Sequence, residues 1–202
     1  MRAALFALVT MFSVRSLFGG QSMYVAICNA SGLPETVVSH AQKEIVLVFS
    51  AAGADISWVA CVDVSTAKAE LGNQLFVVRL LRSGPSSTSR NVALDTMGRA
   101  YTNERGAGYL ADAYMPSINV CAEHNGVDRA SLLGLVISHE LGHLLLGPGH
   151  VPSGLMYGTW KSHEIEAIRK RWLRFDRQQA SIIQRELEKR AEEAKVEHAT
   201  QN

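Results

Sequence analysis

One run of the sequence limits the fold more than any other: His-Glu-Leu-Gly-His at residues 139–143, inside a long apolar stretch. Residues 131–146 are apolar on nearly every side of a helical projection, which predicts a buried helix. Asp128 is suited to cap its start. Gly147 followed by Pro148 predicts its end, because glycine permits a left-handed residue and proline cannot continue a helix. The chain must therefore fold around a central, buried helix.

The histidines of this helix predict a metal site. His139 and His143 lie one turn apart on the same helix face, so both imidazoles can bind one ion. Glu140 is displaced around the helix and comes to lie beside the ion, where a general base is needed. His150 follows the glycine turn and can fold back toward the same ion. The alternative is that these histidines are structural, but the helix, the glycine stop and the third histidine together favour a zinc site.

This stretch resembles the metzincin clan of zinc peptidases, whose signature is His-Glu-x-x-His-x-x-Gly-x-x-His followed by a methionine turn. Residues 153–157, Ser-Gly-Leu-Met-Tyr, resemble that turn, and Leu-Met-Tyr is similar to the matrixin branch. The resemblance covers residues 128–160. It implies that the three histidines bind Zn²⁺, that Glu140 is the base and that Met156 forms an apolar floor beneath the ion. It also implies an α/β (α+β) single domain with a small, mixed, twisted sheet, an active-site helix and C-terminal helices.

The third ligand has a second candidate. The motif contains one more residue before its glycine than the metzincin signature, and one residue turns a helix by about 100°. The loop must compensate if His150 is to reach the ion. Gluzincins, the thermolysin-like zinc peptidases, instead take a glutamate from a later helix, and Glu164 lies in such a predicted helix. Met156 has no special purpose in that scheme, which favours His150.

The predicted activity is that of a zinc metalloendopeptidase. Three neutral imidazoles leave the fourth position of zinc for water, and zinc lowers the pKa of that water from about 15.7 toward about 7. Glu140 would accept the proton of this water and later pass one to the leaving amine. A peptide or protein substrate would lie along an edge strand above the helix, held by backbone pairing.

Two other functions use the same residues. One is a metal-dependent endoribonuclease resembling the bacterial rRNA-maturation family, whose motif is His-x-x-x-His-x-x-x-x-x-His. The last gap differs by one residue here, and that motif requires neither Glu140 nor Met156. The other is a non-catalytic zinc-binding module. Metal content together with a protease assay separates the three hypotheses.

Composition is that of one compact domain with appendages: 202 residues, of which 47% are hydrophobic. A formal net charge of +1 predicts no strong attraction to nucleic acid or to anionic membranes. No apolar run reaches the roughly 20 residues that a membrane-spanning helix needs. The expected partner is therefore a peptide or protein substrate, with no nucleic acid and no stable membrane span.

The N-terminus predicts a signal peptide at residues 1–22. Arg2 precedes an apolar stretch at residues 3–14, and Gly20-Gln21-Ser22 offers small residues for a cut before Met23. The protein is therefore expected to be exported, either secreted or periplasmic. A misplaced translation start or a buried first helix would also explain the pattern.

Residues 23–175 are expected to form the zinc metallopeptidase-like domain, and residues 176–202 a charged helical tail, solvated rather than bound to a partner. Strands at 24–28 and 56–61 flank a helix at 34–51, which predicts a parallel pair with a right-handed crossover. If these strands are neighbours, Cys28 and Cys61 emerge at the same edge and can form a disulfide, which export permits.

The remaining elements are shorter. A third strand is expected at residues 74–81, because Leu-Phe-Val-Val-Arg-Leu-Leu is rich in strand formers. Residues 98–101 and 118–121 are expected to be short strands, one of them along the substrate cleft. From Ser162 the chain is expected to be helical. Four side chains are expected to face the core there: Ile165, Ile168, Trp172 and Phe175.

Overall fold

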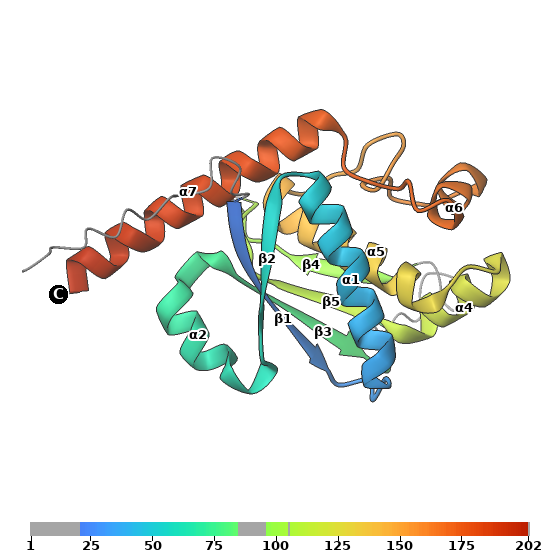
Figure 1. Cartoon of the computed structure of the whole chain (residues 1–202), viewed down its shortest axis with the longest axis horizontal. Helices are drawn as coiled ribbons and strands as arrows, with labels where there is room; N and C mark the ends of the chain where they lie inside the picture. The colour runs from blue at the N-terminus through green and yellow to red at the C-terminus, as the bar shows by residue number, and fades with distance from the viewer. Residues whose placement is uncertain (1–20, 85–95, 105, 202) are drawn as a thin grey trace, which may run out of the picture.

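A five-stranded sheet in the order β2-β1-β3-β5-β4 forms the centre of the molecule (Figure 1). The computed structural model describes residues 21–84, 96–104 and 106–201. The first four strands of that order are parallel, and β4 pairs antiparallel with β5 at the edge. The strands are β1 (Gln21–Asn29), β2 (Ala54–Val59), β3 (Leu75–Leu81), β4 (Gly98–Tyr101) and β5 (Leu110–Tyr114). This mixed sheet with helices confirms the predicted α/β (α+β) class.

Helices cover the two faces of the sheet unequally. On one side α1 (Glu35–Ala51) and α5 (Arg129–Leu146) pack together against the sheet, whereas the short α2 (Val64–Leu71) covers part of the other side (Figure 1). Successive residues of a strand point to opposite faces. Val25 accordingly joins the large core under α1 and α5, while Tyr24 joins the small cluster around α2. The other elements are η1 (Cys61–Asp63), η2 (Gly72–Gln74), α4 (Met115–Asn125), α6 (Ser162–Arg169) and α7 (Arg177–Gln201).

The central helix α5 has the predicted limits. The Asp128 carboxylate accepts a hydrogen bond of 2.7 Å from the backbone N–H of Ser131, which confirms the N-cap. Gly147 has a φ of 89° and ends the helix. Nearly every side chain between these ends is buried, which confirms that α5 is a core helix.

The first two strands also agree with the sequence. They are parallel neighbours joined through α1, and Cys28 and Cys61 form a disulfide with a Cα–Cα distance of 5.2 Å. The predicted signal peptide, residues 1–22, lies outside the described residues except for Gln21 and Ser22, which begin β1 and pair with β2. In the part of the chain that is described, no helix combines the length and apolar character needed to cross a membrane.

In the middle of the chain the strand predicted at residues 98–101 is confirmed as β4, one predicted strand was wrong, and one strand was missed. Residues 118–121 are not a strand but part of α4, which has Pro116 in its first turn and ends at Gly126 with a φ of 58°. Ile-Asn-Val-Cys has strand-forming residues, but the flanking proline and glycine have the positions they take at helix ends. The fifth strand is instead β5, with the sequence Leu-Ala-Asp-Ala-Tyr. Its alanines and aspartate are weak strand formers, and burial between β3 and β4 overrides that weakness.

The C-terminal region is more closely attached than a solvated tail would be. The helix expected from Ser162 breaks after α6, and Trp172, expected in the core, is 72% exposed. The helix ends in a left-handed turn, in which Arg171 has a φ of 58° and the N–H of Trp172 donates to the Ala167 carbonyl at 2.8 Å. The second helix, α7, then buries Ile183 and Leu187 against the main core.

Candidate metal centre

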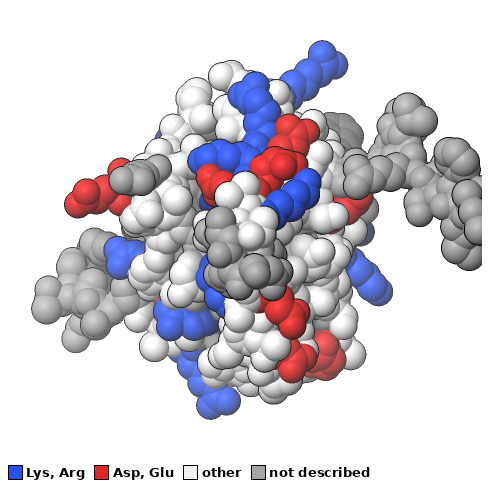
Figure 2. All heavy atoms as spheres, turned by 90° about the vertical axis from the view of Figure 1, so that its left-hand side faces the viewer, with Lys and Arg blue, Asp and Glu red and all other residues white. Residues whose placement is uncertain are grey.

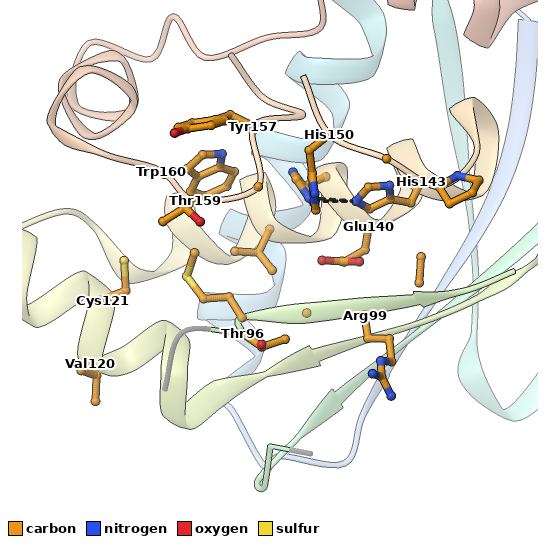
Figure 3. A pocket seen from close by; sticks show the side chains of 18 of the residues that line it. Thr96, Arg99, Val120, Cys121, Glu140, His143, His150, Tyr157, Thr159 and Trp160 are labelled. Carbon is orange, nitrogen blue, oxygen red and sulfur yellow. Dashed lines mark hydrogen bonds between the residues drawn. The ribbon is translucent and has the colours of Figure 1, made fainter. Parts of the chain in front are cut away.

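Helix α5 and the loop after it bring three imidazoles together (Figure 3). The Nε2 atoms of His139 and His143 are 3.1 Å apart, and those of His143 and His150 are 3.2 Å apart. Two imidazole ligands of a tetrahedral zinc ion, each about 2.0–2.1 Å from the metal, would have nitrogens about 3.3 Å apart. The three histidines are thus spaced as the ligands of one ion.

Backbone carbonyls determine which ring nitrogen of the two helical histidines carries the proton. His139 Nδ1 lies 2.7 Å from the carbonyl oxygen of Leu155, and His143 Nδ1 lies 3.3 Å from that of Gly147. A carbonyl oxygen only accepts, so each Nδ1–H is the donor and each neutral Nε2 keeps a lone pair. These lone pairs face each other at 3.1 Å, an unfavourable arrangement that a shared cation relieves. The donor set therefore fits a metal ion that prefers imidazole.

Burial keeps these two rings neutral. It lowers the pKa of His139 to about 4, although the hydrogen bond to Leu155 acts in the opposite direction, and it also lowers the pKa of His143. Neutral imidazole is the form that binds a metal. His150 differs from both because it is exposed on the loop.

Glu140 lies beside the histidines and faces the edge strand β4 (Figure 3). Burial raises the pKa of its carboxyl to about 8, while the backbone N–H of Ala100 and the charge of Arg99 act to lower it. A Cβ placed on Gly98 would lie 2.6 Å from Glu140 Oε1, so β4 approaches the carboxylate more closely than a side chain would allow. Gly98 is a site residue that the sequence analysis missed, since a single glycine in a short strand has many explanations.

Met156 is buried against the same helix. A Cβ placed on Gly142 would lie 2.6 Å from Met156 Sδ, so the glycine beside His143 leaves room for the thioether. Glycine inside a helix costs about 1 kcal/mol relative to alanine, and this packing accounts for its presence. Met156 therefore packs against α5 at Gly142, the residue before His143, and its role as an apolar floor stays a prediction.

Glu164 occupies a different place. Its carboxylate accepts a hydrogen bond of 3.1 Å from the backbone N–H of Lys161. Burial would raise the pKa of this carboxyl, but the N–H donors lower it below its usual value. Among the described residues, the histidine group includes His150 and not Glu164.

The glycine turn, residues 147–150, absorbs the additional residue of the motif. Gly147 and Gly149 have φ values of 89° and 122°, which residues with a side chain rarely adopt. This backbone returns the chain toward α5 and places His150 next to His143. The loop therefore compensates for the longer spacing between the second histidine and the glycine.

A cleft of about 560 Å³ opens beside the histidines (Figure 3). Its walls come from β4, α4, α5 and the loop that follows the glycine turn. Met97 and Gly98 lie on the β4 side, Val120 and Cys121 on α4, and Trp160 on the loop. The three histidines and Glu140 are thus accessible from a space large enough for several side chains.

No protein-family model and no curated protein sequence matches this chain. Among solved structures, the chain is similar to archaemetzincin from Methanopyrus kandleri, with a TM-score of 0.53 and 16% sequence identity. The match covers 84% of this chain and 97% of that one. At this identity the likeness is one of fold: the same arrangement of sheet and helices extends over most of both chains.

Proposed function

We propose that this protein is a zinc-dependent metallopeptidase. One observation carries the proposal: ligand atoms of three histidines lie within 4.8 Å of one another, with a buried glutamate beside them at the wall of an open cleft. The fold likeness to archaemetzincin supports the metzincin resemblance found in the sequence.

His139, His143 and His150 would hold the metal through their Nε2 atoms. A zinc ion bound there supplies Lewis-acid chemistry, in that it lowers the pKa of a water ligand and polarises a carbonyl. Glu140 takes a proton from the attacking water and delivers one to the leaving amine. Its pKa of about 8 refers to the chain without metal, and a nearby cation stabilises the carboxylate form that a base requires.

The substrate would be an extended peptide lying along β4. This strand is at the edge of the sheet, so one side of its backbone is not paired within the sheet. Met97, Gly98 and Ala100 also line the cleft. Backbone pairing with an exposed edge strand is a common way to bind extended peptides, and here it would bring the peptide past the histidines.

The alternatives receive less support from the same region. A ribonuclease needs cationic side chains for the phosphate backbone. Arg99 is the single Lys or Arg among the described residues that line the cleft. On a different side of the molecule, the left-hand side of Figure 1, acidic and basic side chains are mixed (Figure 2). A non-catalytic zinc module would not require a glutamate held at the cleft wall beside the ligands.

We also propose that the protein is exported. The N-terminal sequence has the features of a signal peptide. The Cys28–Cys61 disulfide adds support, because such bonds persist in oxidising compartments.

Replacing Glu140 by glutamine tests the catalytic assignment. Glu140→Gln removes the base but no metal ligand, so zinc content should remain one per chain while peptide hydrolysis falls by roughly 10²-fold or more. Glu166→Gln, an exposed carboxylate on α6, is the matched control and should retain activity. Equal hydrolysis by wild type and Glu140→Gln would remove Glu140 from the mechanism. A zinc-loaded wild type that cleaves no peptide in a broad library would favour the non-catalytic module.

A further inference from the structure

Glu164 is a buried carboxylate close to the metal centre that has no part in the chemistry described so far. It is 3% exposed, whereas Glu166, on the same short helix, is an exposed partner of Lys170 and Arg169. Burying a carboxylate costs free energy unless hydrogen bonds satisfy it. The hydrogen-bond partners of Glu164 therefore indicate which part of the structure this buried carboxylate holds in place.

Those partners include the two ends of one loop. The backbone N–H of Lys161 donates to the Glu164 carboxylate at 3.1 Å, and the backbone N–H of Gly154 acts on the same carboxylate to lower its pKa. The exposed His163 also contacts it, with Nδ1 3.3 Å from Oε1. Residues 154–161, here called the methionine loop, begin and end at these two N–H groups. A single carboxylate thus closes the loop at its base, and charge-assisted hydrogen bonds of this kind are roughly twice as strong as neutral ones.

The methionine loop presents three groups to the histidines. The Leu155 carbonyl accepts the hydrogen bond of 2.7 Å from His139 Nδ1. The indole N–H of Trp160 donates to the same carbonyl at 3.2 Å, and its ring packs edge-on to His139 with centroids 5.9 Å apart. Gly158 lies against His150, since a Cβ placed there would be 2.8 Å from the imidazole Nδ1.

We propose that Glu164 is a positioning residue of the metal centre: by closing the methionine loop it fixes the Leu155 carbonyl, which orients His139 toward the metal. The inference rests on the proposed metal site but not on peptide hydrolysis. Trp160 is the second support of this carbonyl. The carbonyl therefore has one donor in the ligand and one donor in the loop, and the loop is held in place by Glu164.

Metal affinity of the full-length chain tests the proposal. Zinc is titrated against a competing chelator at pH 7 in wild type, Glu164→Gln and Glu164→Ala, with Glu166→Gln as the control. Mutation of a group that orients a metal ligand typically weakens metal affinity by about 10–100-fold. We expect Glu164→Ala to fall in this range, Glu164→Gln to weaken affinity less because one acceptor oxygen remains, and Glu166→Gln to match wild type.

Two further measurements separate positioning from general stability. The visible spectrum of the cobalt-loaded chain reports ligand geometry, and it should change in the Glu164 variants but not in Glu166→Gln. Trp160→Phe removes one donor to the Leu155 carbonyl and keeps an aromatic ring, so it should weaken zinc binding by a smaller factor. If Glu164→Ala fails to fold, the volume-conserving Glu164→Gln decides.

The proposal is overturned if folded Glu164→Gln binds zinc within about twofold of wild type and has the wild-type cobalt spectrum. That outcome leaves the metallopeptidase proposal intact. Conversely, a wild type that binds zinc but cleaves no peptide contradicts the proposed function and leaves the role of Glu164 unchanged. A wild type that binds no zinc contradicts both proposals.

Discussion

The candidate metal centre has two halves, and they are built in different ways. Helix α5 supplies His139 and His143 from a regular, buried element whose 3.6-residue period sets their relative position. Residues 147–161 supply the exposed His150 and the Leu155 carbonyl from irregular backbone, whose shape depends on glycines and on contacts with α6. The helix thus positions two of the proposed ligands through local geometry, while the loop positions the third through tertiary contacts.

This difference explains where the motif tolerates change. The additional residue relative to the metzincin signature lies at the end of α5, after both helical histidines. Within the helix it would have rotated the second histidine by about 100° away from the first. At the helix end it alters only the path of the glycine turn, and His150 still comes within 3.2 Å of His143.

Removing a ligand from the helical half should have the largest effect. His139→Ala deletes the most buried of the three imidazoles, and the buried Leu155 carbonyl loses its ring donor as well. We expect no stoichiometric zinc after loading and desalting, measured by elemental analysis. His40→Ala, a half-exposed histidine of α1 outside the group, is the control and should keep one zinc per chain. Stoichiometric zinc in His139→Ala would refute the site.

Removing the loop ligand should have a smaller effect. His150→Ala leaves the two helical imidazoles in place, so zinc should still bind, but much more weakly than to wild type in chelator competition. Its affinity should lie between those of wild type and His139→Ala. Wild-type affinity in this variant would mean that the third ligand lies elsewhere, with Glu164 as the candidate that the sequence supplies.

A third variant acts on the helix end without touching any ligand. Arg190 of α7 is buried and donates hydrogen bonds to the carbonyls of Leu144, Gly108 and Asn73, at 2.8, 3.1 and 3.1 Å. It also pairs with Glu186 at 2.9 Å. It therefore connects the last turn of α5 with η2, with the loop before β5 and with the C-terminal helix.

Arg190→Ala should reduce the free energy of unfolding by about 3–5 kcal/mol, the usual cost of removing one partner of a buried ion pair. The neighbouring exposed Lys189→Ala should change it by no more than about 1 kcal/mol. Urea unfolding of the metal-free chains measures both. A change below about 1 kcal/mol in Arg190→Ala would mean that α7 does not support the helical half of the site.

The sequence predicted the helical half of the site better than the loop half for a physical reason. Spacing along a helix determines side-chain directions, so His139, Glu140 and His143 could be placed from their order alone. The Leu155 carbonyl is a backbone atom, and any residue could have supplied it. Gly98 matters because it has no side chain to collide with Glu140. That close approach can be recognised only when the positions of β4 and α5 are known.

The fold shows the same division. The first parallel strands, α1 and α5 follow from hydrophobic period and helix-end residues, and the structure confirms them. β5 could not be recognised, because Ala-Asp-Ala has no strand signature and its burial comes from its neighbours. The tight attachment of α7 was also hidden, since a buried arginine in a charged sequence is indistinguishable from an exposed one until its carbonyl partners are known.

The most direct test of the account is a crystal structure of the zinc-loaded chain, with the metal located by anomalous scattering at the zinc edge. The account predicts one ion about 2.0–2.1 Å from each of the Nε2 atoms of His139, His143 and His150, with Glu140 beside it and not bound to it. A zinc ion bound by a Glu164 carboxylate oxygen, with His150 turned to solvent, would contradict the metzincin-like arrangement and favour the gluzincin one.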